Sequence, residues 1–400
     1  MHNIMRAKAI LKKGKENSIL RRHPWVFSGA IHSMSDNIEE GDLLDLYNSK
    51  EEFLGTGHYQ IGSITIRLFE FKQVENIDLA YWTTRLAEII DTRRQLGYLD
   101  DPDTNIFRLV HAEGDSMPGL IIDMYNGTAV IQCHSIAMWN LKQDFTNILI
   151  KLLGDQIKAV YDKSAETLPF KADISPVNAY LYGAENSVKQ GREYGNDFAI
   201  DWETGQKTGF FIDQRENRAL LGKYSKDKKI LNTFCYSGGF SIFALNAGAK
   251  EVHSLDSSKK AIELVEANLE FIPELKSKHT SIVADAVKYI RDLASEYDII
   301  VLDPPAFAKH KNARHNAIQA YKRLNQRAME QIKPGGLLFT FSCSQVVTKD
   351  LFNGAILAAA IEANKKVRIL HQLHQPADHP INVFHPESEY LKGMVLQIID

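Results

Sequence analysis

The chain has few cysteines and no long apolar run. Its 400 residues include three cysteines, Cys133, Cys235 and Cys343, whose spacing matches neither a disulfide framework nor a metal site. No stretch approaches the roughly 18 consecutive apolar residues of a membrane helix, and basic residues interrupt the segment where a signal peptide would lie. We therefore expect no membrane span and no metal, and a cytoplasmic protein with reduced thiols.

The chain also has no strong net charge, no internal repeat and no low-complexity tract. Its net charge of −3, with 44% hydrophobic and 24% charged residues, is typical of a globular protein. The charge is uneven locally, because residues 6–22 contain seven basic residues against the single Glu16. Composition alone does not distinguish a phosphate-binding surface from a solvated charged face in this stretch.

The length predicts several domains, since single cores usually stop growing near roughly 250 residues. Strand patterns at 7–11, 43–47, 53–59 and 63–69 predict a small β-rich domain over residues 1–75. A helix over 79–96, strands near 108–110, 119–124 and 128–134, and a helix over 141–153 predict a central α/β domain over residues 76–185.

Strands alternate with helices in the remaining domain, residues 186–400. Buried-looking strand patterns occur at 230–234, 251–255, 281–284, 299–302 and 337–341, with helical patterns at 260–271 and 317–332. This alternation predicts a Rossmann-like α/β fold, with a mainly parallel sheet covered on both faces. Residues 367–373 and 393–399 could add two strands at the far edge.

The turn after the first of these strands is rich in glycine. It reads Asn232-Thr233-Phe234-Cys235-Tyr236-Ser237-Gly238-Gly239-Phe240. Adjacent glycines let the backbone approach a ligand, and the following helix directs free amides toward it. Asp256 closes the next strand, where an acid can accept hydrogen bonds from ribose hydroxyls. Phe234, Tyr236, Ser237, Gly238 and Asp256 are therefore candidate cofactor residues.

Two further strands end in acidic residues. Asp285-Ala286 follows the third strand, where it could meet an adenine edge, and Asp303-Pro304-Pro305 follows the fourth. The series resembles the motifs of class I methyltransferases, which bind S-adenosylmethionine, better than G-x-G-x-x-G, which is absent. A nucleotide-dependent oxidoreductase would share the glycine turn and Asp256, but it explains neither Asp303 nor Cys343.

Cys343 follows the fifth strand and is the candidate catalytic nucleophile. Carbon-5 of cytosine becomes nucleophilic when a thiolate adds to carbon-6, so Cys343 could support 5-methylcytosine formation. Ionising half of an ordinary thiol at pH 7 needs roughly 2 kcal/mol of stabilisation, whose source the sequence does not identify. Asp303 is the candidate acid for the cytosine ring. Cys133 and Cys235 are interpreted as packing residues.

The Asp303-Pro304-Pro305 motif allows a second interpretation. Methyltransferases that modify exocyclic amino groups use Asp or Asn before Pro-Pro and an aromatic to hold the target nitrogen. An RNA base-amino methyltransferase is therefore the nearest alternative. A non-catalytic RNA-binding ribosome-assembly factor that uses the cofactor only structurally is a further one.

Several segments together resemble the bacterial ribosomal RNA cytosine-5 methyltransferases of the RlmI type over nearly the whole chain. They are His23-Pro24-Trp25-Val26-Phe27-Ser28-Gly29-Ala30, Glu113-Gly114-Asp115-Ser116-Met117-Pro118-Gly119-Leu120-Ile121-Ile122-Asp123, Gly205-Gln206-Lys207-Thr208-Gly209-Phe210-Phe211-Ile212-Asp213-Gln214-Arg215, the glycine turn, Asp303-Pro304-Pro305-Ala306-Phe307 and Ser342-Cys343-Ser344.

The resemblance implies an N-terminal PUA β-barrel that binds RNA, a small central α/β domain and a class I methyltransferase domain. It makes Lys12, Lys13, Arg21 and Arg22 of the basic stretch candidates for binding RNA phosphates, and the alternative is a solvated charged face. It implies that Gln214 lies over the methionine part of S-adenosylmethionine, that Cys343 is the nucleophile and that the substrate is 23S ribosomal RNA. Related families with two cysteines carry one beside Asp-Pro-Pro, which this chain lacks, so the proton-abstracting base stays unassigned. Three questions are left open: which nucleotide is methylated, whether the substrate is naked RNA or an assembling subunit, and whether the protein is a homodimer or a monomer.

Overall fold

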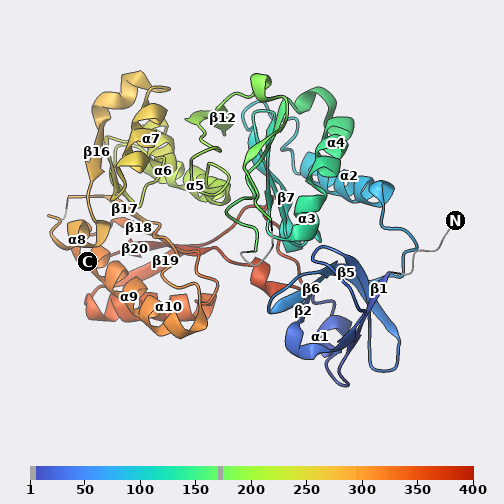
Figure 1. Cartoon of the computed structure of the whole chain (residues 1–400). Coiled ribbons are helices and arrows are strands. Elements are labelled where there is room, and N and C mark those ends of the chain that lie inside the picture. The colour runs from blue at the N-terminus through green and yellow to red at the C-terminus, as the bar shows by residue number, and fades with distance from the viewer. Residues whose placement is uncertain (1–5, 170–173, 295) are drawn as a thin grey trace. The chain divides into compact units, whose positions relative to one another are not determined.

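A computed structural model describes residues 6–169, 174–294 and 296–400 of the chain (Figure 1). The chain forms two compact units. Unit 1 contains Met1–Gly191, Ile200–Phe210 and Ala377–Ser388, and unit 2 contains Arg192–Ala199, Phe211–Pro376 and Glu389–Asp400. Within the described residues, no helix is long and apolar enough to cross a membrane.

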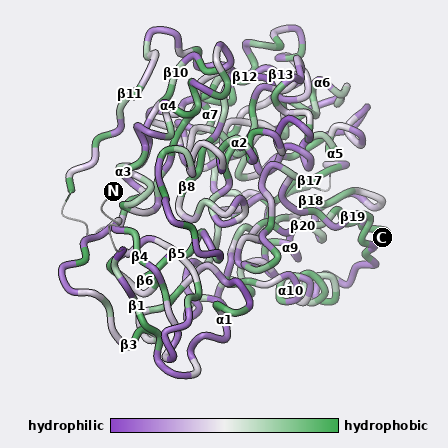
Figure 2. The backbone as a smooth tube through the Cα atoms, turned by 90° about the vertical axis from the view of Figure 1, so that its right-hand side faces the viewer, coloured by the Kyte–Doolittle hydropathy of each residue, from purple (hydrophilic) through white to green (hydrophobic). Residues whose placement is uncertain are grey.

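Unit 1 begins with a six-stranded sheet in the order β2-β6-β5-β4-β1-β3. Its strands are β1 (Ala7–Leu11), β2 (Trp25–Phe27), β3 (Ile31–Met34), β4 (Leu43–Tyr47), β5 (Phe53–Tyr59) and β6 (Ile64–Glu70), with the short helix α1 (Asn17–Leu20). Burial alternates along β4, where Leu44 and Leu46 enter the core between more exposed neighbours. Figure 2 shows strands β1 and β3 to β6 of this sheet with the backbone coloured by hydropathy.

The central part of unit 1 is a five-stranded sheet in the order β11-β10-β9-β8-β7. Its strands are β7 (Ile106–His111), β8 (Leu120–Tyr125), β9 (Thr128–Cys133), β10 (Ala159–Asp162) and β11 (Ala179–Tyr182), and its helices are α2 (Leu79–Gln95), α3 (Ile136–Asn140) and α4 (Lys142–Leu153). Asp78 accepts a hydrogen bond from the Tyr81 amide at the start of α2, and Ser135 caps α3 through the Met138 amide.

Unit 2 is built on a seven-stranded sheet in the order β16-β15-β14-β17-β18-β20-β19. The strands are β14 (Lys229–Thr233), β15 (Glu251–Asp256), β16 (His279–Val283), β17 (Ile299–Leu302), β18 (Leu337–Ser342), β19 (Val367–His374) and β20 (Lys392–Ile398). β14 to β18 pair in parallel, whereas β20 is antiparallel to both β18 and β19. A two-stranded sheet, β12 (Gln190–Glu193) with β13 (Asn196–Ala199), precedes it.

Helices cover both faces of this sheet (Figure 1). They are α5 (Arg215–Ser225), α6 (Gly239–Asn246) and α7 (Lys259–Leu269) on one face, and α8 (Ala286–Arg291), α9 (Arg314–Gln331) and α10 (Lys349–Glu362) on the other. Buried side chains of α8 to α10 and of the strands form one continuous core that includes Leu302, Tyr321 and Phe352. Parallel strands can be almost wholly apolar because both of their faces are covered.

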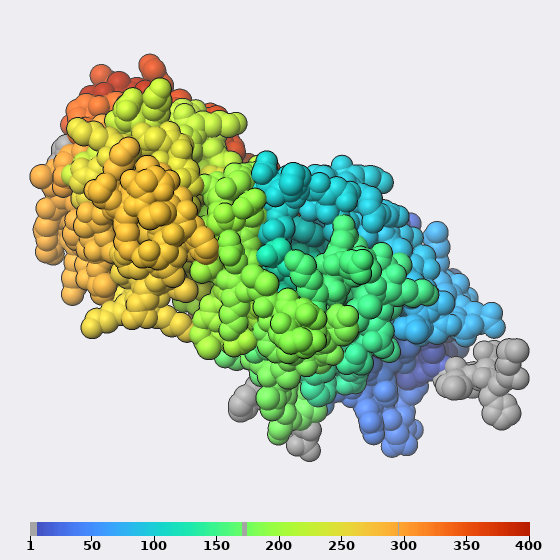
Figure 3. Space-filling model, turned by 90° about the horizontal axis from the view of Figure 1, so that it is seen from above, coloured from blue at the N-terminus to red at the C-terminus, as the bar shows by residue number. Residues whose placement is uncertain are grey.

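The predicted sheet of unit 2 is confirmed, including the two added strands, with one correction. Residues 281–284 were expected to form a buried strand, whereas β16 ends at Val283 and lies at the sheet edge with its residues partly exposed. Residues coloured yellow to orange, which include α7 and α8, form much of the surface of this unit in Figure 3. An edge strand has a neighbour on one side only, so its burial is lower.

Candidate active site

The candidate site lies where the parallel strands of unit 2 end. β14, β15, β17 and β18 end at Thr233, Asp256, Leu302 and Ser342, and their parallel registers bring these ends to one edge of the sheet. The order of the strands reverses at β14, because β15 and β16 lie on one side of it and β17 and β18 on the other. Open α/β sheets bind ligands in the crevice at such a switch point.

The turn after β14 is held in a strained conformation. Phe234 and Tyr236 have φ of 55° and 47°, in the left-handed region that residues other than glycine rarely adopt. Such residues cost of order 1–3 kcal/mol each and occur mostly at functional sites. The Tyr236 amide donates to Asp256 Oδ2 (3.1 Å), so the acid after β15 helps to hold this conformation.

Close packing fixes the two glycines of the turn. Gly238 has φ 77°, and a Cβ there would lie 3.1 Å from the side chain of Val265. A Cβ on Gly239 would meet Arg218 at 2.9 Å. Ser237 is buried, and its carbonyl accepts a hydrogen bond from Asn268 (2.6 Å). The backbone can therefore enter α6 closely enough for its first amides to face a ligand.

Asp256 and Asp285 lie at successive strand ends and differ in their surroundings. Asp256 is half-buried, and its Oδ1 accepts from the Ser258 amide (2.9 Å). Asp285 is exposed and caps α8 by accepting from the Lys288 amide (3.0 Å). Ala286 was expected at a strand end, but it is the buried first residue of α8, because the strand has already ended at Val283.

Asp303 follows β17 and contacts Gln214. Gln214 Nε2 donates to Asp303 Oδ2 (3.0 Å), and Gln214 Oε1 accepts from Asn217 Nδ2 (2.6 Å). Burial of the carboxyl group, together with the nearby charge of Asp213, raises the pKa of Asp303 to about 7. A carboxyl group with this pKa is partly protonated at neutral pH, so it can donate a proton or a hydrogen bond.

The three thiols differ in exposure. Cys133 and Cys235 are buried, and burial raises the pKa of Cys133 to about 12 and the pKa of Cys235 further still. Cys343 is partly exposed and follows the last residue of β18. β17 and β18 are adjacent parallel strands, with Leu302 paired to Thr340, so Asp303 and Cys343 leave the same edge on neighbouring strands.

Sequence reasoning assigned no role to Arg218 and Lys392, two of the buried cations in this unit. Arg218 forms a two-pronged ion pair with Glu193 (both 2.7 Å) and also donates to the Phe211 carbonyl (2.9 Å). Lys392 is buried in β20 and donates to the carbonyls of Ser344 (2.7 Å) and Val347 (2.8 Å). The only signal in the sequence was a charged residue within an otherwise apolar strand, Lys392 before Gly393-Met394-Val395-Leu396.

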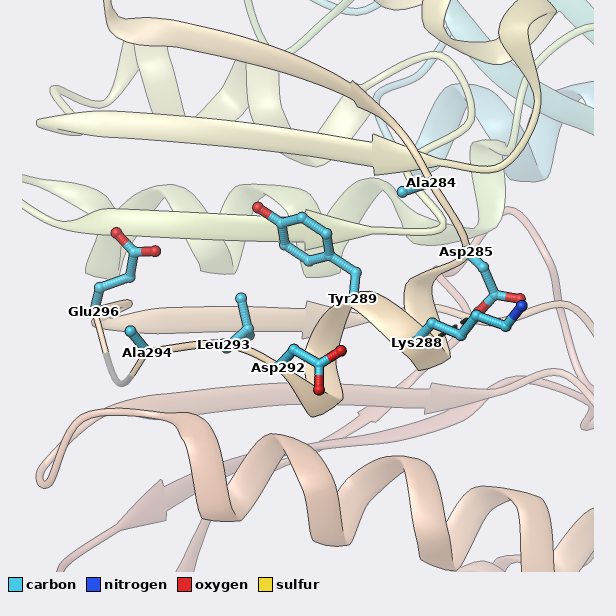
Figure 4. A pocket seen from close by; sticks show the side chains of 8 residues that line it. All are labelled: Ala284, Asp285, Lys288, Tyr289, Asp292, Leu293, Ala294 and Glu296. Atoms are coloured by element: carbon cyan, nitrogen blue, oxygen red, sulfur yellow. Dashed lines mark hydrogen bonds between the residues drawn. The ribbon is translucent and has the colours of Figure 1, made fainter.

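A pocket of about 560 Å³ lies beside α8 (Figure 4). It is lined by Ala284, Asp285, Lys288, Tyr289, Asp292, Leu293, Ala294 and Glu296. Asp285 and Lys288 lie at one end and Ala294 and Glu296 at the other. Asp285 of the predicted adenine end lines this pocket, whereas Asp303 and Cys343, the candidate catalytic residues, do not.

In unit 1 the four candidate RNA-binding residues are all exposed. Lys12 Nζ donates to the Gly29 carbonyl (3.0 Å), and Arg22 lies over the ring of Phe384 (5.6 Å). Two other basic residues of the same stretch are paired, Arg6 with Asp45 (3.3 Å) and Lys8 with Glu51 (2.9 Å). The exposed positive charge of the stretch is therefore smaller than its composition suggests.

Unit 1 also holds a group with metal-ligand spacing. The ligand atoms of His23, His385 and Glu387 all lie within 4.8 Å of one another. The Trp25 amide donates to His23 Nδ1 (3.2 Å), however, which places the proton of neutral His23 on Nε2, facing Glu387 (3.4 Å). A metal on Nε2 would require that proton on Nδ1, so we assign no metal to this group.

Comparisons with known proteins agree with this geometry. A family profile described as S-adenosylmethionine-dependent methyltransferase matches residues 169–387, more than half of the chain, and a profile described as PUA-like domain matches residues 9–71. The ribosomal RNA large subunit methyltransferase I of Alteromonas mediterranea is 35% identical over 99% of this chain and 100% of its own length. That of Tolumonas auensis is 36% identical over 97% and 98%.

Solved structures show the same fold. A putative SAM-dependent methyltransferase from Streptococcus mutans has a TM-score of 0.81 at 24% identity, covering 98% of this chain and 99% of that one. SMU.776, a putative methyltransferase complexed with SAH, has a TM-score of 0.82 at 24% identity over the same shares. The predicted fold class, with an N-terminal PUA-like domain, is confirmed, and the cofactor is S-adenosylmethionine. The chain therefore belongs to the ribosomal RNA large subunit methyltransferase I family of S-adenosylmethionine-dependent methyltransferases.

Proposed function

We propose that the protein transfers a methyl group from S-adenosylmethionine to carbon-5 of a cytosine in 23S ribosomal RNA, through a covalent adduct with Cys343. One observation carries the proposal: a partly exposed thiol and a carboxyl group that is protonated near neutral pH leave adjacent strands at the same sheet edge. The names of the relatives supply ribosomal RNA as the substrate class.

The residues of the turn and of the neighbouring strand ends would hold the cofactor. Asp256 would accept hydrogen bonds from the ribose hydroxyls, and the α6 amides and the turn from Phe234 to Gly238 would contact the methionine part, together with Gln214. Asp285 and Ala286 would meet the adenine. The bound cofactor supplies an electrophilic methyl group on a sulfonium.

The reaction then follows from the two residues at the strand ends. The Cys343 thiolate attacks carbon-6 of cytosine and forms a carbon–sulfur bond, while Asp303 gives a proton to ring nitrogen N3. The electron pair, now available at carbon-5, would form a bond to the methyl group as the methyl–sulfur bond breaks, and the electrons of that bond would stay on the sulfur of the departing cofactor, which becomes a neutral thioether. A base removes the carbon-5 proton, the carbon–sulfur bond breaks, Cys343 leaves as thiolate, and N3 returns its proton to Asp303.

The protonation of Asp303 favours carbon-5 over an exocyclic amino group. An amino methyltransferase needs an acceptor that holds the N–H groups of the target, which is the role of an ionised or amide side chain. A carboxyl group with a pKa of about 7 is partly protonated at neutral pH and can also donate, and a cytosine that receives its proton is the better electrophile at carbon-6. We therefore rank the base-amino methyltransferase second and the non-catalytic assembly factor third.

Removing the thiol tests the proposal. Purified native protein and Cys343→Ser are incubated with labelled S-adenosylmethionine and unmodified 23S ribosomal RNA, and the modified nucleoside is identified by mass spectrometry. We expect 5-methylcytosine from the native protein and at least a hundredfold lower rate from Cys343→Ser, because the serine hydroxyl is not ionised. Cys133→Ser, which removes a buried thiol of unit 1, serves as the matched control. Full methylation by Cys343→Ser would refute the covalent mechanism.

A further inference from the structure

Lys392 is a buried cation without a carboxylate partner. Its residue is 7% exposed, and lysine is almost never buried at this level unless it is paired. Among the residues that the structure describes, no aspartate or glutamate forms an ion pair with its ammonium group. The ammonium donates only to the carbonyls of Ser344 (2.7 Å) and Val347 (2.8 Å), which carry no charge.

The strand pairing brings this cation to the nucleophile. Lys392 lies opposite Ser342 in the antiparallel pair of β18 and β20, and Cys343 is the next residue after Ser342. Both carbonyls that accept hydrogen bonds from Lys392 belong to the loop that begins at Cys343. The negative charges of an ionised Cys343 and of Glu389 both favour the charged form of Lys392, which raises its pKa.

We propose that Lys392 is a positioning residue whose buried ammonium group provides the counter-charge that stabilises the Cys343 thiolate. The proposal rests on the proposed function, in which that thiolate attacks the base. Desolvation disfavours the charged form of a buried lysine, and an adjacent anion offsets part of that cost. The same attraction stabilises the thiolate and so favours ionisation of the thiol. The phenol of Tyr321 on α9 also interacts with Cys343, and burial, which raises the pKa of this phenol, keeps it neutral. Lys392 thus places a positive charge beside the loop that begins at Cys343.

Burial also sets the pH range in which the pair can work. Desolvation lowers the pKa of Lys392 to about 8, and the thiolate of Cys343 opposes this change. At neutral pH the lysine is charged and can stabilise the thiolate. Above about pH 8 the lysine would lose its proton unless the thiolate retained it, so the two groups titrate as a coupled pair.

The pH dependence of Cys343 alkylation measures this coupling without any methyl transfer. Cys133 and Cys235 are buried, so the reaction of the full-length native protein with iodoacetamide reports Cys343, with Cys343→Ser as the blank. Lys392→Gln removes the charge but keeps a donor for one carbonyl, Lys392→Met removes both, and Lys392→Arg keeps the charge. Calorimetry with S-adenosylmethionine establishes that each variant is folded.

We expect the native thiol to ionise below the ordinary value of about 8.5. Lys392→Gln and Lys392→Met should both raise its apparent pKa by about one unit or more, which is roughly a tenfold lower alkylation rate at pH 7, and Lys392→Arg should restore it. A native thiol that ionises at or above 8.5, or a Lys392→Gln profile equal to the native one, would show that Lys392 only holds the loop. Undiminished methylation by Cys343→Ser would instead overturn the proposed function and leave this result standing.

Discussion

At the scale of single residues, Asp303 links the geometry of the site to a pH dependence. Its neutral form is the one that can protonate the base, and its pKa of about 7 lies far above that of an ordinary aspartate. The thiolate of Cys343 becomes more abundant as the pH rises, whereas neutral Asp303 becomes scarcer. Catalysis that requires both should therefore have a bell-shaped pH profile.

We expect Asp303→Asn to lower kcat by at least tenfold and to remove the fall in rate above about pH 7, because asparagine does not titrate. The measurement is the pH profile of 5-methylcytosine formation, and Asp227→Asn, which alters an exposed carboxyl just before β14, is the control. A fall in rate above pH 7 that persists in Asp303→Asn would assign the transition to another group.

The same residue predicts how stability changes with pH. The folded protein binds a proton at Asp303 more tightly than the unfolded chain does, so the unfolded state holds fewer protons between about pH 4 and 7. The stabilising contribution of Asp303 to the free energy of unfolding is therefore present in full at low pH, and it is lost as the pH rises through about 7. The melting temperature of the native protein relative to Asp303→Asn should fall over this range, and a relative increase would contradict the shifted pKa.

At the scale of elements, the buried pair of Arg218 on α5 and Glu193 on β12 connects a helix to a hairpin strand that precedes it. Both side chains are almost wholly buried, and Arg218 also lies against Gly239 of the cofactor turn. Removing one partner leaves an uncompensated buried charge, which typically costs about 3–5 kcal/mol.

We expect Arg218→Met to lower the free energy of unfolding by about 3–5 kcal/mol and to weaken S-adenosylmethionine binding, and the double variant Arg218→Met with Glu193→Gln to recover part of the stability. Denaturant unfolding measures the first effect and calorimetry the second. Arg291→Met, which breaks an exposed pair with Asp292, should leave the free energy of unfolding almost unchanged, because solvent screens this pair. An equally small effect at Arg218 would show that the pair is dispensable.

The elements were predictable to different degrees for physical reasons. The strand and helix patterns of unit 2 were strong because both faces of its sheet are buried, so the apolar runs at 299–302 and 337–341 matched β17 and β18 closely. The start of α8 was less predictable, since a local cap by Asp285 ends the strand region early. Lys392 and the Arg218–Glu193 pair depend on contacts between segments far apart in sequence, which periodicity cannot show.

At the scale of the whole molecule, the sequence predicted separate domains for RNA binding and catalysis, and a PUA-like domain profile matches residues 9–71. The C-terminal segment Ala377–Ser388 nevertheless belongs to unit 1, although the chain on both sides of it belongs to unit 2. Asp378 in this segment accepts from the Arg108 amide (2.9 Å), a pairing across 270 residues. When a late segment of the chain packs against a much earlier one, as here, no local pattern in the sequence indicates it.

If the exposed basic residues of unit 1 bind phosphates, neutralising them should reduce the salt dependence of RNA binding. We expect Lys12→Gln, Lys13→Gln, Arg21→Gln and Arg22→Asn together to lower the slope of log K against log salt by roughly 0.7–0.9 for each phosphate that the variant no longer neutralises. Asn suits residue 22 because Arg22 has φ 61°. The control neutralises the exposed Lys226, Lys228, Lys366 and Arg368, which lie near the amino ends of β14 and β19 in unit 2. Equal slopes in native protein and variant would remove the assigned role.

The covalent adduct between Cys343 and carbon-6 is the central claim, and RNA containing 5-fluorocytosine tests it most directly. Fluorine replaces the carbon-5 proton, so the methylated adduct cannot eliminate the cysteine and should accumulate. We predict a protein–RNA complex that survives denaturing electrophoresis, requires S-adenosylmethionine, and yields a modified peptide containing Cys343 by mass spectrometry. Absence of the complex with native protein that methylates ordinary ribosomal RNA, or its persistence in Cys343→Ser, would contradict the mechanism.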